Sequence, residues 1–223
     1  MNSKVIEFSR SRPKRRKYSM ALTEERKKQI ENQVKEIIKT CKFTKLPTVD
    51  ISSLIEKDGF VIKTEFMPIH TTGILFVDES DKDNPIREIT VNEVFTNPNK
   101  EEDIIYKKSR FITAHEYGHY ILHGKTGILS QPIYIHRDSD TREEEIELEA
   151  DYFARAILMP VLPFKECYNI AKRITGNDII LMLDILSKAF GVTQQKVSVR
   201  INDMQELGLF AIETEEKRPD FNE

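Results

Sequence analysis

At 223 residues, the chain is long enough for one compact domain with appendages or for two small domains. Apolar residues make up 39% and charged residues 32%, which excludes fibrous and fully disordered proteins. No apolar stretch approaches the roughly 18 residues of a membrane span, and the N-terminus has no apolar signal-peptide core. The two cysteines, Cys41 and Cys167, form no CxxC pair, so no disulfide framework is predicted. The expected compartment is a reducing cytoplasm.

The first twenty residues form a basic tail, although the net charge of the chain is only −3. The tail contains one acid, Glu7, and seven basic residues: Lys4, Arg10, Arg12, Lys14, Arg15, Arg16 and Lys17. A basic run can contact nucleic acid or an acidic partner, but short terminal charge runs are more often solvated. We expect a solvated tail, with nucleic-acid contact as the alternative.

The segment 21–45 is predicted to contain an amphipathic helix. Thr23-Glu24-Glu25 supplies a cap and acids for its start. Apolar residues then recur at helical spacing: Ile30, Val34, Ile37, Ile38 and Cys41. A short helix after Pro47, ended by Gly59, is expected next.

Three strands are predicted around residues 60–66, 73–77 and 88–91. The polar, turn-forming segment 78–85 separates the last two strands. These strands predict a small antiparallel sheet, packed on helices, and therefore an α+β fold.

Longer helices follow the strands. One is predicted from Glu101 to His123, where Gly124 ends it, and another from Thr141 to Met159, where Pro160 closes it. The remainder, from Pro163 to Phe210, predicts three or four short helices with breaks at Gly176 and Gly191.

The first of these long helices carries the motif His-Glu-x-x-His at residues 115–119. Residues four apart on a helix lie one turn apart on nearly the same face, so His115 and His119 can both point at one metal ion. Glu116 flanks the two ligands and would lie beside the position of an attacking water, as a general base does. Surface histidines would be the simpler interpretation, but the surrounding residues are apolar. The pattern indicates zinc-assisted amide hydrolysis.

A catalytic zinc ion needs a third protein ligand, and the next helix offers five glutamates: Glu143, Glu144, Glu145, Glu147 and Glu149. Glu147 and Asp151 lie four apart beside the small residues Ala150 and Ala154, which would allow a close approach to the first helix. We predict that Glu147 is the ligand and that Asp151 orients a ligand imidazole. Glu145 and Glu149 fall off the alanine side and are predicted to face solvent.

His123 also lies four residues after a ligand histidine. In the extended pattern HExxHxxGxxH a glycine turns the chain before the third histidine, but here Leu122 stands in the glycine place. We therefore predict that His123 caps the helix or binds a partner and is not a metal ligand.

Three segments, 115–123, 147–154 and 158–160, resemble the ImmA/IrrE family of metallopeptidases. The resemblance extends from about Leu46 to the final LGLF at 207–210. It implies that His115, His119 and Glu147 bind Zn²⁺, that Glu116 is the catalytic acid/base and that Asp151 supports the ligands. Family members are cytoplasmic bacterial or phage-borne regulators, and several cut a helix-turn-helix repressor in mobile-element or stress-response circuits. A repressor substrate is thus implied.

The segment 186–201 also resembles a helix-turn-helix, with Gly191 at the turn, Thr193 as a cap and Val197 and Ile201 toward the core. Four side chains could contact DNA: Gln194, Gln195, Lys196 and Arg200. We prefer a packing or repressor-docking role for this segment. A non-catalytic DNA-binding regulator, or an interaction module with a structural metal, remains the alternative.

The sequence divides the chain into five parts. These are the basic tail 1–20, the amphipathic helix 21–45, a zinc metallopeptidase domain 46–160, a C-terminal helical subdomain 161–213 and a polar tail 214–223. Three side chains are candidates for stabilising a developing oxyanion: Tyr134, His136 and Tyr152.

Overall fold

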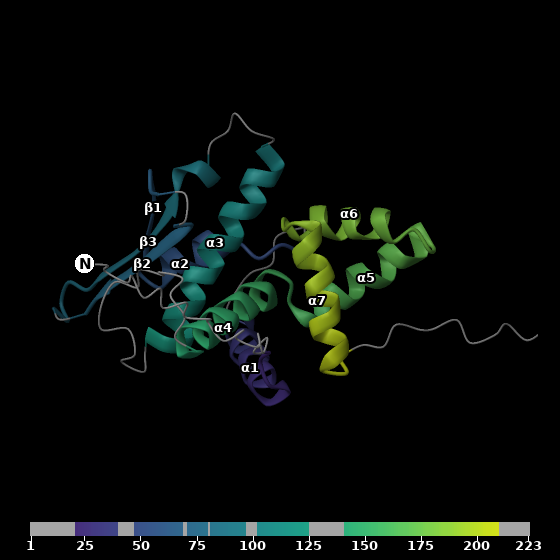
Figure 1. Cartoon of the computed structure of the whole chain (residues 1–223), viewed down its shortest axis with the longest axis horizontal. Helices are drawn as coiled ribbons and strands as arrows, with labels where there is room; N and C mark the ends of the chain where they lie inside the picture. Colours follow the sequence, from purple (N-terminus) through teal and green to yellow (C-terminus); the bar gives the residue numbers. More distant parts are fainter. Residues whose placement is uncertain are drawn as a thin grey trace, which may run out of the picture.

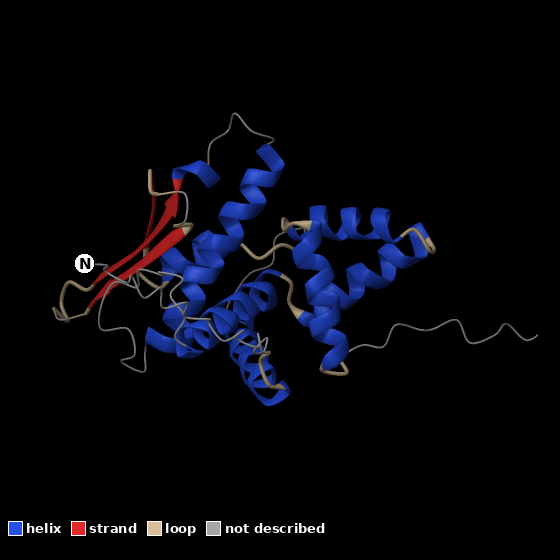
Figure 2. Ribbon diagram, in the orientation of Figure 1, coloured by secondary structure: helices blue, strands red, loops and turns tan. Residues whose placement is uncertain are grey.

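The computed structural model describes residues 21–39, 47–68, 71–79, 81–96, 102–124 and 141–209. Within these ranges a small sheet lies with helices α1 to α4, and helices α5 to α7 form a second group beside them (Figures 1 and 2). The predicted α+β class is confirmed. None of the helices in these ranges is long and apolar enough to cross a bilayer. The predictions for the tails 1–20 and 214–223 and for Cys41 fall outside the described residues.

The sheet consists of β1 (Val61–Glu65), β2 (Gly73–Asp78) and β3 (Ile86–Asn92), with β3 in the centre. β2 pairs with β3 in antiparallel register, and β1 pairs with β3 in parallel register. The sheet is therefore mixed, and the prediction of a purely antiparallel sheet was wrong for the β1–β3 pair.

Asn92, at the end of β3, accounts for this topology. Its buried side-chain amide donates to the carbonyl oxygens of Thr71 at 2.7 Å, Met67 at 3.1 Å and Pro68 at 3.2 Å. These bonds hold the connection between β1 and β2 across the end of β3, so β1 and β2 do not form a hairpin. A buried amide with several acceptors is strongly constrained.

The helices beside the sheet begin with α2 (Ile51–Lys57) and the short 3₁₀ turn η1 (Glu93–Phe95). The long helices α3 (Glu102–His123) and α4 (Thr141–Leu158) agree with their predicted ranges to within one residue at each end. The second half of α4 is fully buried at six positions: Tyr152, Phe153, Ala154, Ala156, Ile157 and Leu158. α4 is thus the element against which α1, α3 and α7 pack.

Helix α1 (Glu24–Lys39) packs on α4. Its apolar stripe is buried at Ile30, Val34 and Ile38, which confirms the predicted amphipathic helix. The Arg26 guanidinium also donates to both carboxylate oxygens of Glu149 on α4, each at 2.6 Å. A bidentate pair of this kind fixes both distance and orientation.

The C-terminal group consists of α5 (Val161–Thr175), α6 (Ile179–Phe190) and α7 (Gln194–Glu206). The predicted breaks at Gly176 and Gly191 are confirmed. Gly191 has a φ of +59°, a left-handed conformation that a glycine adopts without strain.

The helix-turn-helix geometry of α6 and α7 is partly as predicted. Thr193 caps α7 by accepting from the Lys196 N–H, and Val197 and Ile201 are buried. Arg200, however, is fully buried and donates to the carboxylate of Glu31 on α1. It cannot contact DNA from this position.

Glu31 is the acceptor on which several buried groups converge. Besides Arg200, the Tyr152 hydroxyl on α4 donates to it at 2.8 Å, so one carboxylate joins α1, α4 and α7. Arg200 also donates to the carbonyl oxygen of Met159 at 3.0 Å. A buried charge needs such partners because its desolvation is unfavourable.

We predict that Glu31→Ala lowers the free energy of unfolding by about 3–5 kcal/mol, because it leaves the buried Arg200 guanidinium without its carboxylate. Urea unfolding followed by circular dichroism measures this change. The double variant Glu31→Leu/Arg200→Met should recover most of the loss.

Glu36→Ala is the matched control, since Glu36 is an exposed residue of α1 that pairs with Lys39 one turn away. Its loss should stay below about 0.5 kcal/mol. Equal destabilisation by the two single variants would contradict the role given to Glu31.

Candidate metal centre

Helices α3 and α4 approach each other closely at Gly118. A Cβ added there would lie 2.9 Å from Phe153 Cδ1 and 3.3 Å from the carbonyl oxygen of Ala150. Any larger side chain would therefore push the two helices apart. The predicted close approach on the alanine face of α4 is confirmed, since Ala150 and Ala154 are fully buried.

This contact brings together the three predicted ligands. The Nε2 atoms of His115 and His119 are 3.1 Å apart. The carboxylate of Glu147 lies 3.2 Å from the first, through Oε2, and 3.1 Å from the second, through Oε1. The two imidazoles come from α3 and the carboxylate from α4, so the group is assembled across the helix contact (Figure 1).

The size of this triangle fits a metal ion. Around a tetrahedral zinc ion with bond lengths of about 2.0–2.1 Å, neighbouring ligand atoms lie about 3.3 Å apart. The three separations in the protein are only slightly shorter. Two imidazoles and one carboxylate are also a donor set used by catalytic zinc sites.

The pKa shifts of His115 and Glu147 also favour a bound cation. Burial by itself would lower the pKa of His115, but hydrogen bonds with Asp151 and Glu147 raise it to about 10. Burial by itself would raise the pKa of Glu147, but hydrogen bonds with His115 and His119 lower it to about 2. The carboxylates thus attract positive charge to this point, and a metal ion would supply that charge in place of the ring protons.

Asp151 lies where the sequence predicted. Its Oδ1 is 3.1 Å from Nδ1 of His115, on the side of the ring that faces away from the triangle. The Nδ1 of His119 is buried and has no hydrogen-bond partner among the described residues. His115, one of the predicted ligands, therefore has the carboxylate support that is typical of metal-bound imidazoles.

Glu116 is 3% exposed, and its carboxylate lies against Gly73 at the start of β2. A Cβ added to Gly73 would come within 2.7 Å of Glu116 Oε1, so the glycine leaves room for this carboxylate. Burial raises the pKa of Glu116, although the charges of His115 and His119 act to lower it. The sequence did not indicate Gly73, whose importance depends on a strand that is distant along the chain.

The burial of Glu149 contradicts one prediction. This residue is 6% exposed and binds Arg26, whereas the sequence predicted that it faces solvent; Glu145 is exposed, as predicted. The reason is α1, which packs on α4 and brings Arg26 to Glu149. His123 lies 3.6 Å from Glu149, outside the ligand triangle, and burial lowers its pKa to about 4.

The oxyanion candidates are not brought to the site by any described contact. Tyr152 is fully buried, and its hydroxyl is engaged by Glu31 of α1, to which it donates at 2.8 Å. It cannot stabilise an oxyanion beside Glu116. Tyr134 and His136 lie outside the described residues.

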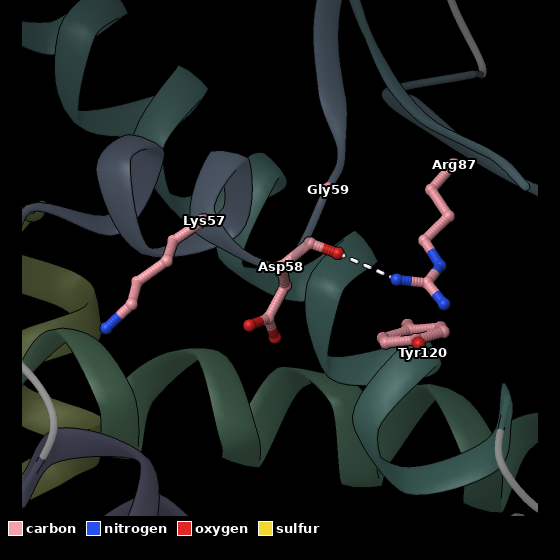
Figure 3. A pocket seen from close by; sticks show the side chains of 5 residues that line it. All are labelled: Lys57, Asp58, Gly59, Arg87 and Tyr120. Carbon is pink, nitrogen blue, oxygen red and sulfur yellow. Dashed lines mark hydrogen bonds between the residues drawn. The ribbon is translucent and has the colours of Figure 1, made fainter. Parts of the chain in front are cut away.

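A separate hollow is lined by Lys57, Asp58, Gly59, Arg87 and Tyr120 (Figure 3). The Arg87 guanidinium lies over the Tyr120 ring, 5.6 Å from its centroid, and donates to the carbonyl oxygen of Asp58 at 2.8 Å. It also binds Glu79. These contacts satisfy the arginine and support α3 from the side of the sheet, and no residue of the ligand triangle lines the hollow.

The candidate DNA contacts on α7 divide into two pairs. Gln194 and Gln195 are exposed, whereas Arg200 is buried and Lys196 turns toward Asp151, with 3.4 Å between Nζ and Oδ2. Both basic members of the set therefore have partners inside the protein. This leaves little positive charge on α7 for a phosphate backbone.

An HExxH helix with a glutamate from the next helix beside it is a pattern typical of metallopeptidases. The comparison with protein families agrees, because residues 60–202 match the family described as Peptidase_M78, the IrrE N-terminal-like domain. The match covers more than half of the chain, and the chain belongs to this family. The matched range, 60–202, is shorter than the range of the resemblance, 46–210. Helices α1 and α2 both lie before the matched range. No curated protein matches the chain.

We predict that the purified protein binds one divalent metal ion per chain and that His115→Ala abolishes this binding, because two remaining donors cannot hold the ion. Elemental analysis after dialysis measures the metal content. His123→Gln is the control, since that histidine lies outside the triangle and the variant should keep its metal. Retention of metal by His115→Ala would contradict the assignment of the triangle.

Proposed function

We propose that this protein is a zinc-dependent endopeptidase that works in the cytoplasm. The observation that carries the proposal is the triangle of His115, His119 and Glu147 with the buried carboxylate of Glu116 beside it. A structural zinc site needs four protein ligands and no neighbouring base, whereas a catalytic one has three and leaves a position open.

Each residue has a distinct role in this proposal. His115, His119 and Glu147 hold the zinc ion, and Asp151 accepts a hydrogen bond from Nδ1–H of His115 and so fixes the tautomer and the angle of that ring. Bound zinc would supply the Lewis acidity that polarises the scissile carbonyl and makes a water molecule easier to deprotonate.

Glu116 handles the protons. Its carboxylate takes a proton from the attacking water and later gives it to the leaving amine nitrogen. Its buried position favours this exchange because burial raises its pKa toward the working pH. Gly73 keeps the space that the carboxylate occupies.

The proposed substrate is a helix-turn-helix transcriptional repressor, whose cleavage would relieve repression in a mobile-element or stress-response circuit. The resemblance to the ImmA/IrrE metallopeptidases supports this choice. The alternative, a non-catalytic DNA-binding regulator, draws less support because Lys196 and Arg200 are bound to carboxylates within the protein.

Incubation of the protein with the helix-turn-helix repressor encoded beside its gene tests the proposal. We expect the zinc-loaded wild type to cut the repressor, and Glu116→Gln to bind zinc but leave the repressor intact, since the amide cannot accept the proton. Mass spectrometry of the products identifies the cut. DNA binding by both forms, with no cleavage by either, would favour the regulator.

A second prediction concerns Gly73. In Gly73→Ala the new methyl group would displace the Glu116 carboxylate, so kcat should fall by about tenfold or more while KM and zinc content change little. Steady-state kinetics on the cleaved repressor, with elemental analysis in parallel, separates these effects. Unchanged kcat in a well-folded Gly73→Ala variant would show that the contact with Glu116 has no role in catalysis.

A further inference from the structure

Lys196 is held at the meeting point of three helices. It belongs to α7, and its Nζ lies 3.6 Å from the ring centroid of Phe111 on α3. The same nitrogen lies 3.4 Å from Oδ2 of Asp151 on α4. A lysine held on one side by an aromatic face and on the other by a carboxylate has little freedom to move.

The contact continues toward the metal centre. Asp151 uses its other oxygen, Oδ1, for Nδ1 of His115 at 3.1 Å. A continuous line of contacts therefore runs from Lys196 through Asp151 to a predicted metal ligand. The sequence indicated Lys196 only as a candidate for contact with DNA.

Arg155 is the second cation near Asp151, but it is less well placed. Its Nη1 lies 3.7 Å from Asp151 Oδ2, and its Nε donates to Asp203 on α7 at 2.7 Å. Lys196 is closer to Asp151 than Arg155 is. It is therefore the group best placed to hold Oδ2.

The orientation of the Asp151 carboxylate depends on a partner at Oδ2. The Asp151 side chain is 38% exposed, so water can reach the carboxylate and compete for its hydrogen bonds. A carboxylate that is bound at one oxygen only can rotate, and its hydrogen bond to the imidazole then weakens. A cation on Oδ2 keeps Oδ1 directed at His115.

We propose that Lys196 is a positioning residue of the metal centre, which acts through Asp151 on the His115 imidazole. The C-terminal helical subdomain thereby forms part of the centre. This inference rests on the proposed function, because the orientation of His115 matters when zinc is bound. By thermodynamic reciprocity, zinc binding also stabilises the docking of α7.

Zinc affinity, measured by competition with a chromophoric chelator, tests the inference without any assay of activity. Loss of a partner that supports a metal ligand typically weakens metal binding by about 10–100-fold, which we expect for Asp151→Asn. Lys196→Met keeps the length of the side chain but loses the charge, and it should weaken zinc binding by about 3–10-fold because it acts one contact further away. Lys196→Arg keeps the positive charge, so it should bind zinc more tightly than Lys196→Met.

A general effect of removing a lysine is excluded by Lys188→Met. Lys188 is an exposed residue of α6 that pairs with Asp184 in the same subdomain, and its replacement should leave zinc affinity unchanged. Urea unfolding of the metal-free variants shows whether each one is folded. If Lys196→Met does not fold, Lys196→Gln takes its place.

The double variant Lys196→Met/Asp151→Asn gives the decisive comparison. If Lys196 acts through Asp151, the double variant should bind zinc no more weakly than Asp151→Asn alone. Wild-type affinity in Lys196→Met, or losses that multiply fully in the double variant, would overturn the inference and leave the proposed function standing. Failure of the wild type to bind zinc would instead overturn the proposed function.

Discussion

The contact between α3 and α4 at Gly118 is the constraint on which the rest of the structure depends. The two histidines and the glutamate that form the candidate metal centre lie on different helices, and their polar atoms approach to 3.1–3.2 Å only because the helix backbones lie so close. A glycine on one helix and small residues on the other permit that approach. Gly118 immediately precedes His119, so the close helix contact lies next to a candidate ligand.

Helix packing also buries charged side chains, and the surrounding helices supply partners of opposite charge. Charged side chains that lie between packed helices need partners, because their desolvation is unfavourable. α1 supplies Arg26 to Glu149 and Glu31 to Arg200, and α7 supplies Lys196 to Asp151. Two of these pairs depend on α1, which lies outside the part of the chain that matches the family. This N-terminal helix is therefore built into the support of the central helix α4.

The sheet bounds the space around Glu116 on one side. β2 is at the edge of the sheet nearest α3, and its first residue, Gly73, lies against Glu116. β2 reaches this place because the connection from β1 crosses the end of β3, where Asn92 binds it. A hairpin between β1 and β2 would have put β2 in the centre of the sheet, so a single buried amide side chain has a direct consequence for the candidate site.

The sequence by itself determined the local features of this protein. Helical spacing placed His115 and His119 on one face, acids and small residues on the next helix indicated Glu147 and Asp151, and apolar periodicity gave the limits of α3 and α4. These features depend on residues within one or two helical turns, which a pattern can show. The strand order, the burial of Glu149 and Arg200, the role of Gly73 and the turning of Lys196 toward Asp151 were decided only by the tertiary structure. In each case the partner lies far away along the chain, and the energy of burying a charge or an amide depends on that partner rather than on the neighbours in sequence.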